Sequence, residues 1–218
     1  MKYIFKNLLN KYKKLFAERD YVIRVLAYLV FFIISIFATY LSISYIDQYY
    51  TGYTIPDIIL DNIPTLNLAY LFFQGAFVFG ITTIAIFTLF PEYIPFGLAT
   101  GALFFTTRSG FMILTHLSAP FIAHYSFVED ETQQAVFTLS SGNDQFFSGH
   151  TGFPFLLALI FWKHKRLRYF FLICSVIAAA VVLLGHFHYS IDVFSAYFIT
   201  YGIFVIAQHT FKKEQQLI

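Results

Sequence analysis

Long apolar runs are the feature that most limits how this 218-residue chain can fold. Several of them reach the roughly 20 consecutive residues that a helix needs to cross the hydrocarbon core of a bilayer. Charged residues make up only 12% of the chain, whereas a soluble globular protein carries about a quarter. We therefore expect an all-α, polytopic membrane protein whose spans form one bundle.

Six apolar segments separated by polar connections predict six transmembrane helices. They cover approximately residues 21–46, 66–90, 96–117, 148–162, 169–184 and 191–210. No linker rich in Pro, Gly and Ser and no internal repeat divides them, so residues 21–210 are expected to form one transmembrane catalytic domain. Residues 211–218 would then be a short cytoplasmic tail.

Residues 1–20 combine many lysines with apolar residues at roughly helical spacing. This pattern predicts a basic, amphipathic helix that lies on an anionic membrane surface. A solvated basic tail is the alternative interpretation.

The distribution of charge predicts the orientation of the spans. If the N-terminus is cytoplasmic and six spans alternate, every Lys and Arg except Arg108 falls on the cytoplasmic side. The connections on the other side carry acidic residues and no Lys or Arg. By the positive-inside rule, both termini are expected in the cytoplasm. The net charge of +2 is too small to indicate a nucleic-acid partner.

Two polar residues, His188 and Asp192, interrupt the apolar pattern at the start of the last predicted span. If that helix begins near Tyr189, they lie four residues apart on one face. The carboxylate can then accept the Nδ1–H of the imidazole and leave Nε2 as a nucleophile or base. A purely structural hydrogen-bonded pair at a helix end is the alternative.

A second polar stretch, Ser148-Gly149-His150-Thr151, begins the fourth predicted span. Ser148 is a natural N-cap, and Gly149 allows close approach of the backbone. The first helical turn would offer N–H groups and the positive end of the helix dipole to a phosphate oxygen. His150 in that turn could give a proton to a leaving alkoxide.

The predicted topology brings these residues and Arg108 to the same outer face of the membrane. Arg108 would supply a bidentate cation for phosphate oxygens. Two histidines, one beside a carboxylate and one beside an anion seat, suit phosphoryl transfer through a phosphohistidine. Zinc bound by His150, His186 and His188, a proton or ion pathway, and a hydrolase using Ser148 are weaker alternatives. We expect no metal site.

Together, Ser148-Gly149-His150-Thr151 and His188-Tyr189-Ser190-Ile191-Asp192 resemble the motifs of the sphingomyelin synthase family, a branch of the type-2 phosphatidic acid phosphatase superfamily. Further matches in the same order are Pro56-Asp57 with Asp61, Arg108-Ser109 with Thr115 and Pro120, Asp144 four residues before Ser148, His186, and the segment 196–200.

The resemblance implies His188 as nucleophile, Asp192 as its orienting carboxylate and His150 as general acid. It also implies a group of substrate- and phosphate-binding residues, namely Arg108, Ser148, Gly149, Asp144, Asp57, His186 and Tyr189. The implied reaction moves a phospho-headgroup from a glycerophospholipid donor to an acceptor of the ceramide or diacylglycerol type. No metal or organic cofactor is implied, and the site would face the periplasm, the outside of the cell or the Golgi lumen.

The sequence departs from the wider superfamily in having no Lys-x6-Arg-Pro motif and Val182 where a second Arg is usual. A site with one Arg suits a phosphodiester, with one negative charge, better than a monoester. Water as acceptor would make the protein a lipid phosphate phosphatase or a phospholipase C-like hydrolase. A non-catalytic lipid-binding or scrambling protein is the alternative of another class. Choline, ethanolamine and inositol headgroups, and the oligomeric state, are not distinguished by the residues.

Overall fold

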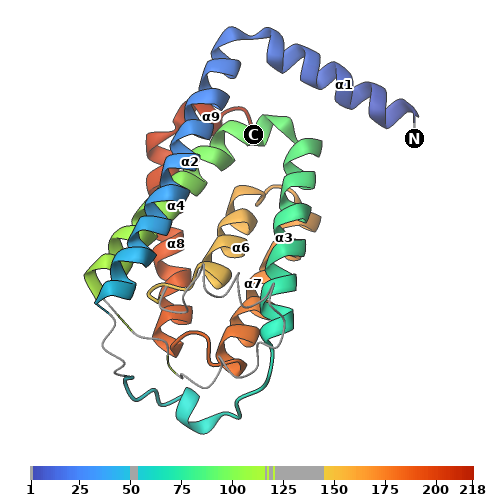
Figure 1. Ribbon diagram of the computed structural model, residues 1–218. Helices are drawn as coiled ribbons and strands as arrows, with labels where there is room; N and C mark the ends of the chain where they lie inside the picture. Colours follow the sequence, from blue (N-terminus) through green and yellow to red (C-terminus); the bar gives the residue numbers. More distant parts are fainter. Residues whose placement is uncertain (1, 50–53, 116, 118–119, 121–144) are drawn as a thin grey trace.

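The computed structural model describes residues 2–49, 54–115, 117, 120 and 145–218. Within these ranges every regular element is a helix, as the composition predicted (Figure 1). The helices are α1 (Lys2–Ala17), α2 (Arg19–Gln48), η1 (Leu60–Asn62), α3 (Ala69–Leu89), η2 (Pro91–Tyr93), α4 (Ile94–Thr115), α6 (Gly149–Ile160), α7 (Lys165–Leu184), α8 (Ser190–Thr210) and α9 (Lys212–Gln215).

Four helices, α2, α3, α7 and α8, are long and apolar enough to cross a membrane. The chain is therefore an integral membrane protein by composition. α4 has 22 residues, but Arg108 and its Gly, Thr and Ser residues make it less apolar than those four. α6 has only 12 residues, or about 18 Å at 1.5 Å per residue. It is shorter than the span predicted over residues 148–162 and than the roughly 30 Å of a hydrocarbon core.

The short helix α6 lies at the centre of the bundle (Figure 1). It packs against α4, α7 and α8, while α2 packs along α4 and α3 packs against α7. The core between these helices is largely aromatic, with Phe104, Phe147, Phe161 and Phe171 inaccessible to solvent. Many aliphatic and aromatic side chains on the outer faces of α2, α3, α7 and α8 are exposed, as expected of surfaces that face lipid.

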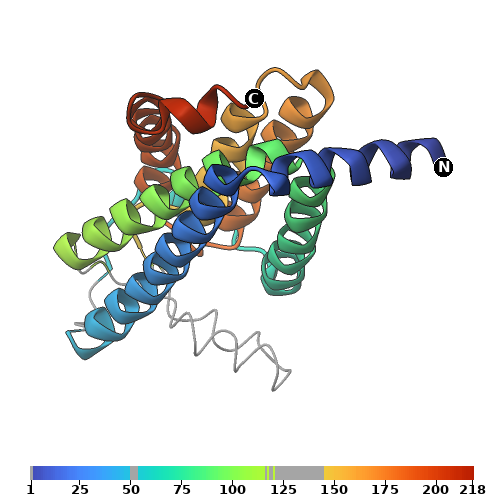
Figure 2. The ribbon, with the colours of Figure 1, turned by 90° about the horizontal axis from the view of Figure 1, so that it is seen from above.

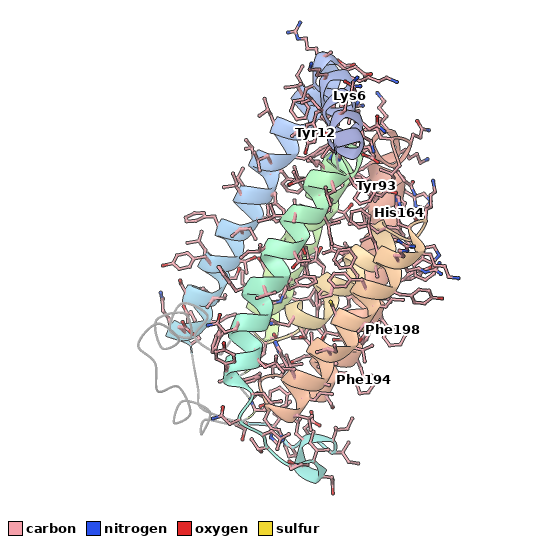
Figure 3. All side chains as sticks on the ribbon, turned by 90° about the vertical axis from the view of Figure 1, so that its right-hand side faces the viewer. Lys6, Tyr12, Tyr93, His164, Phe194 and Phe198 are labelled. Atoms are coloured by element: carbon pink, nitrogen blue, oxygen red, sulfur yellow. The ribbon has the colours of Figure 1, made fainter. Side chains whose placement is uncertain are left out.

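The basic segments of the chain gather at one end of the bundle. α1 extends sideways from that end, where the Tyr12 hydroxyl donates to the carbonyl of Thr88 at 2.9 Å. Figure 3 shows Lys6, Tyr12, Tyr93 and His164 toward this end and Phe194 and Phe198 further toward the other. Residues 211–218, which contain α9, pack back onto the bundle, and the Lys163 ammonium donates to the carbonyl of Ile218 at 2.9 Å.

The connection between α2 and α3 lies across the other end, where α7 and α8 meet. The N–H of Leu66 donates to the carbonyl of Leu184 at 2.8 Å, and the N–H of Ser190 donates to Asp57 Oδ2 at 2.7 Å. These bonds join residues far apart in sequence, so the connection fixes the corner that precedes α8.

Gly152 marks the closest packing of α6 against its neighbours. A Cβ at this position would lie 2.8 Å from Thr200 Oγ1 on α8 and 3.1 Å from the Phe104 ring on α4. We expect Gly152→Ala to lower the free energy of unfolding by about 1–3 kcal/mol, since overpacking a tight core forces neighbours to move. Thermal unfolding in detergent measures the change.

Gly110→Ala is the matched control, because a Cβ on this exposed α4 glycine meets no atom within 4 Å. It should leave stability unchanged or raise it slightly, as Ala favours a helix over Gly. Equal losses in both variants would contradict the close approach at Gly152.

Candidate active site

His188 and Asp192 form a buried pair at the start of α8. The His188 Nδ1 lies 3.3 Å from Asp192 Oδ2, and the two side chains are 1% and 0% exposed. Tyr189 is the N-cap of α8, so His188 lies just before the helix, yet its ring still turns back to Asp192. Asp192 Oδ2 also accepts the N–H of Tyr189 at 3.2 Å, which holds the carboxylate beneath the imidazole.

Gln145 is a second partner of the same imidazole nitrogen, and sequence reasoning missed it. Its Oε1 lies 3.1 Å from His188 Nδ1, while its Nε2 donates to the carbonyl of Phe187 at 3.1 Å. The bond to Phe187 turns the amide oxygen toward the histidine. Two acceptors at Nδ1 favour the tautomer with its proton on that nitrogen, and this tautomer leaves a lone pair on Nε2.

The starts of α6 and α8 are joined by a hydrogen bond between their backbones. The N–H of Ser148 donates to the carbonyl of Asp192 at 3.1 Å. Ser148 is the N-cap of α6, as predicted, and its hydroxyl accepts the N–H of Thr151 at 3.4 Å. These contacts bring His150 to within 6.3 Å of His188 between ring centroids. Both imidazoles therefore lie at one site, close enough to contact the same small group.

The Arg108 side chain extends from α4 into the site and lies against Gly149, the first residue of α6. Its Nε donates to the carbonyl of Phe147 at 2.9 Å, and the residue is only 4% exposed. A Cβ at Gly149 would lie 3.1 Å from this Nε. The glycine of the Ser-Gly-His stretch therefore lets a guanidinium lie against the start of α6, where an anion would be seated.

A cavity of about 480 Å³ begins at this polar cluster. Arg108, Gly149 and His150 line one part of it, and most of the remaining wall is apolar and comes from α3 and α7. The Phe72 ring of α3 lies against His150, with centroids 4.1 Å apart, and against Phe187 at 4.5 Å. Phe72 is a further member of the site that no sequence motif indicated.

Asp57, which the resemblance implied as substrate-binding, binds backbone groups around the start of α8. Its Oδ2 accepts the N–H of Ser190 at 2.7 Å, and its Oδ1 accepts those of Ile59 and Leu60 at 2.9 and 3.1 Å. Burial alone would raise the pKa of this carboxyl, but the backbone donors outweigh it and hold the pKa below the usual value. Asp57 thus caps α8 from a distant segment.

His186 and Tyr189, which the resemblance also implied, make contacts within the same corner. His186 adopts a left-handed conformation, with φ 53°, and ends α7. Its N–H donates to the carbonyl of Leu183, and that of Phe187 to Val182, which is the Schellman pattern of a helix C-terminus. Its ring contacts Thr65 Oγ1 at 3.3 Å. The buried Tyr189 hydroxyl accepts the N–H of Ile55 at 3.2 Å.

Asp144, also expected at the site, lies outside the described residues. Within the described ranges, His, Cys, Asp and Glu form no group of three that could hold a metal ion. The zinc hypothesis thus gains no support from the geometry, because His186 faces Thr65.

The sequence of this region matches a known family. Residues 142–210 match the family model PAP2 superfamily C-terminal. The matched segment contains α6, α7 and α8, and with them His150, His188 and Asp192. The PAP2 match agrees with the motif resemblance at the level of the superfamily and indicates an enzyme that acts on phosphoryl groups. No curated protein and no solved structure shows significant similarity to the chain.

Replacing Asp57 by Asn tests its capping role. At neutral pH we expect Asp57→Asn to lower the free energy of unfolding by about 1–3 kcal/mol, since hydrogen bonds to a charged group are replaced by weaker ones. The pKa of Asp57 is lowered on folding, so its contribution is full above the ordinary value of 3.8 and is lost as the pH falls through the lower folded value.

The stability difference between parent and variant, measured by thermal unfolding in detergent, should therefore shrink only in acid. Asp47→Asn, on an exposed carboxylate, is the control and should change little. A difference for Asp57→Asn that is independent of pH would contradict the assigned cause.

Proposed function

We propose that this protein is a membrane lipid phosphotransferase in which His188 carries the phospho-headgroup between two lipids. The donor is a glycerophospholipid, and the acceptor is a lipid hydroxyl such as that of ceramide. The main support is the pairing of His188 Nδ1 with Asp192 and Gln145 at 3.3 and 3.1 Å. The His150 ring lies nearby, with its centroid 6.3 Å from that of His188. The PAP2 match over this segment supports phosphoryl chemistry.

The first half of the proposed reaction forms a covalent intermediate. His188 Nε2 attacks the phosphorus, and a P–N bond forms as the P–O bond to the diacylglycerol breaks. The departing oxygen takes a proton from His150, so that neutral diacylglycerol leaves. The positive charge on the modified imidazole is stabilised by Asp192, and its Nδ1–H is held by the same two acceptors.

The second half reverses these roles. His150, now neutral, takes the proton of the acceptor hydroxyl as that oxygen attacks the phosphorus. The P–N bond breaks, its electron pair returns to Nε2, and His188 is restored. Arg108 and the first turn of α6 stabilise the negative oxygens in both halves. Arg108 is the only Lys or Arg in the described wall of the cavity, which favours a diester with one negative charge.

We also propose six spans with both termini in the cytoplasm and the site near the opposite side. The basic segments lie together at one end of the bundle, and the α7–α8 corner that carries His188 lies at the other. The positive-inside rule assigns the basic end to the cytoplasm. In this arrangement α4 and α6 complete the six, with α6 and its leading residues as a shortened span.

Hydrolysis is the second candidate, because the PAP2 match does not distinguish water from a lipid as acceptor. Purified protein in vesicles is given phospholipid donors with choline, ethanolamine or inositol headgroups, with and without ceramide, and products are read by mass spectrometry. We expect the headgroup to move only when ceramide is present. Equal loss of donor without ceramide would favour a hydrolase.

His188→Ala should lower turnover by about a thousandfold or more, since the covalent route is lost. Asp192→Asn should lower kcat by about 10²–10⁴-fold and change lipid binding far less. In the parent, donor without acceptor should leave an acid-labile phospho-headgroup on the chain, visible in the intact mass. A His188→Ala variant as fast as the parent would exclude the covalent route through His188, whereas a parent with no turnover would leave lipid binding or scrambling as the function.

Gln145 is proposed as a positioning residue for His188, and its replacement has a distinct signature. Gln145→Leu leaves only Asp192 at Nδ1, so we expect kcat to fall by about tenfold with little change in KM. Gln145→Glu adds a second carboxylate and should move the acidic limb of kcat/KM to higher pH, because it stabilises the imidazolium. Gln48→Leu, on the exposed end of α2, is the matched control.

Unchanged pH profiles in both Gln145 variants, with lower thermal stability alone, would make Gln145 a purely structural residue.

A further inference from the structure

The cavity beside the candidate site has the size and lining of a lipid-chain pocket. Its volume of about 480 Å³ lies within the range of about 300–1,000 Å³ that is usual for ligand sites. Its polar residues Arg108, Gly149 and His150 belong to the candidate site, and most other wall residues are apolar. A ligand that fills it therefore has a polar group at the site and an apolar remainder.

The cavity extends along the axis of α3, away from the histidines. Phe72 lies against His150 at one end of the cavity. Gly75 and Gly80 follow three and eight residues later on α3, which places them about 4–5 Å and about 12 Å from Phe72 along the helix axis. The residues of α7 on the opposite wall indicate that the cavity extends in the same direction. Val182 on α7 is close to the corner that carries His188, and Cys174 lies eight residues earlier. The lining therefore runs along both α3 and α7, which pack against each other (Figure 1).

Gly75 and Gly80 keep this space open. A Cβ built on either residue meets no atom within 4 Å. By contrast, a Cβ built on Gly152 or Gly97 would collide with a neighbouring side chain. Glycine costs about 1 kcal/mol relative to alanine within a helix, and helix packing does not require it at these two positions. A side chain there would point into or along the cavity.

The occupant that fits is a hydrocarbon chain that enters from the bilayer. α3 packs against α7, whereas α4 packs against α2, α6 and α8, and Figure 2 shows α3 standing apart from α2 and α4. Phe105 and Arg108 of α4 nevertheless line the same cavity as the α3 glycines. The cavity therefore lies between two helices that do not pack closely on each other, where a chain can pass sideways from lipid.

We propose that this cavity receives one acyl chain of the lipid donor, and that Gly75 and Gly80 set the length of chain it accepts. The proposal rests on the proposed function for the position of the headgroup. With the phosphorus between His150 and His188, the chain runs past Gly75 first and reaches Gly80 later. Filling the space at Gly80 should exclude the end of a long chain, and filling it at Gly75 should hinder shorter chains as well.

The test uses donors with one headgroup and a series of acyl lengths, and it compares kcat/KM for the parent, Gly75→Leu and Gly80→Leu. We expect Gly80→Leu to lower the ratio of long-chain to short-chain kcat/KM by about tenfold or more, because a few methylenes that no longer fit cost this much. Gly75→Leu should move the loss to shorter chains. Gly110→Leu, on an exposed part of α4 outside the cavity, should keep the parent ratio.

A loss that is equal for all chain lengths, or no change in either glycine variant, would overturn the proposal. The same donors are also bound to His188→Ala versions of these proteins, and retention is measured by native mass spectrometry. If the parent shows no turnover but Gly80→Leu still selects against long chains in retention, the proposed function fails and the chain pocket stands. If the parent turns over donors but neither glycine variant changes the dependence on chain length, the proposed function stands and the chain pocket fails.

Discussion

The burial of Asp192 is the constraint on which the rest of the site depends. Its carboxylate is inaccessible to solvent, in a protein whose surroundings are hydrocarbon, and an ionised group there is costly unless it is paired. Oδ2 accepts the Tyr189 N–H and pairs with His188, while Oδ1 has no hydrogen-bond partner in the described part of the chain. The corner before α8 must therefore fold around this group, and the carbonyl of the same residue holds the start of α6 through Ser148.

Part of this arrangement could be predicted from the sequence because it depends on short spacings. His188 and Asp192 are four residues apart, so their contact was predicted from short spacing, although the histidine makes it from just before the helix and not across a helical turn. Ser148 at an N-cap follows from a local preference in the same way. The all-helical fold follows from the apolar runs. Gln145 and Phe72 could not be found this way, because their contacts with His188 and His150 join segments 43 and 78 residues apart.

The motifs identified residues near the site, and the structure shows the contact that each of them makes. Asp57 and His186 occur in the matched motifs, yet one caps α8 and the other ends α7 in a left-handed conformation. Both roles shape the corner that presents His188, so they act on the site through the backbone. The predicted span over residues 148–162 was too long for a related reason, since apolar composition continues into the turn at residues 161–164 after the helix α6 has ended.

Under the proposed function, the choice between a lipid and water as acceptor depends on what reaches His188 while it carries the headgroup. The imidazole is almost fully buried, and Phe72 lies against both His150 and the neighbouring Phe187. The cavity is lined by His150 and not by His188, and its wall is mainly apolar, so water gains few hydrogen bonds along it. A lipid whose hydroxyl lies at His150 would keep its chains in contact with this wall. Under the proposed function, this apolar surrounding supports an acceptor that comes from the bilayer.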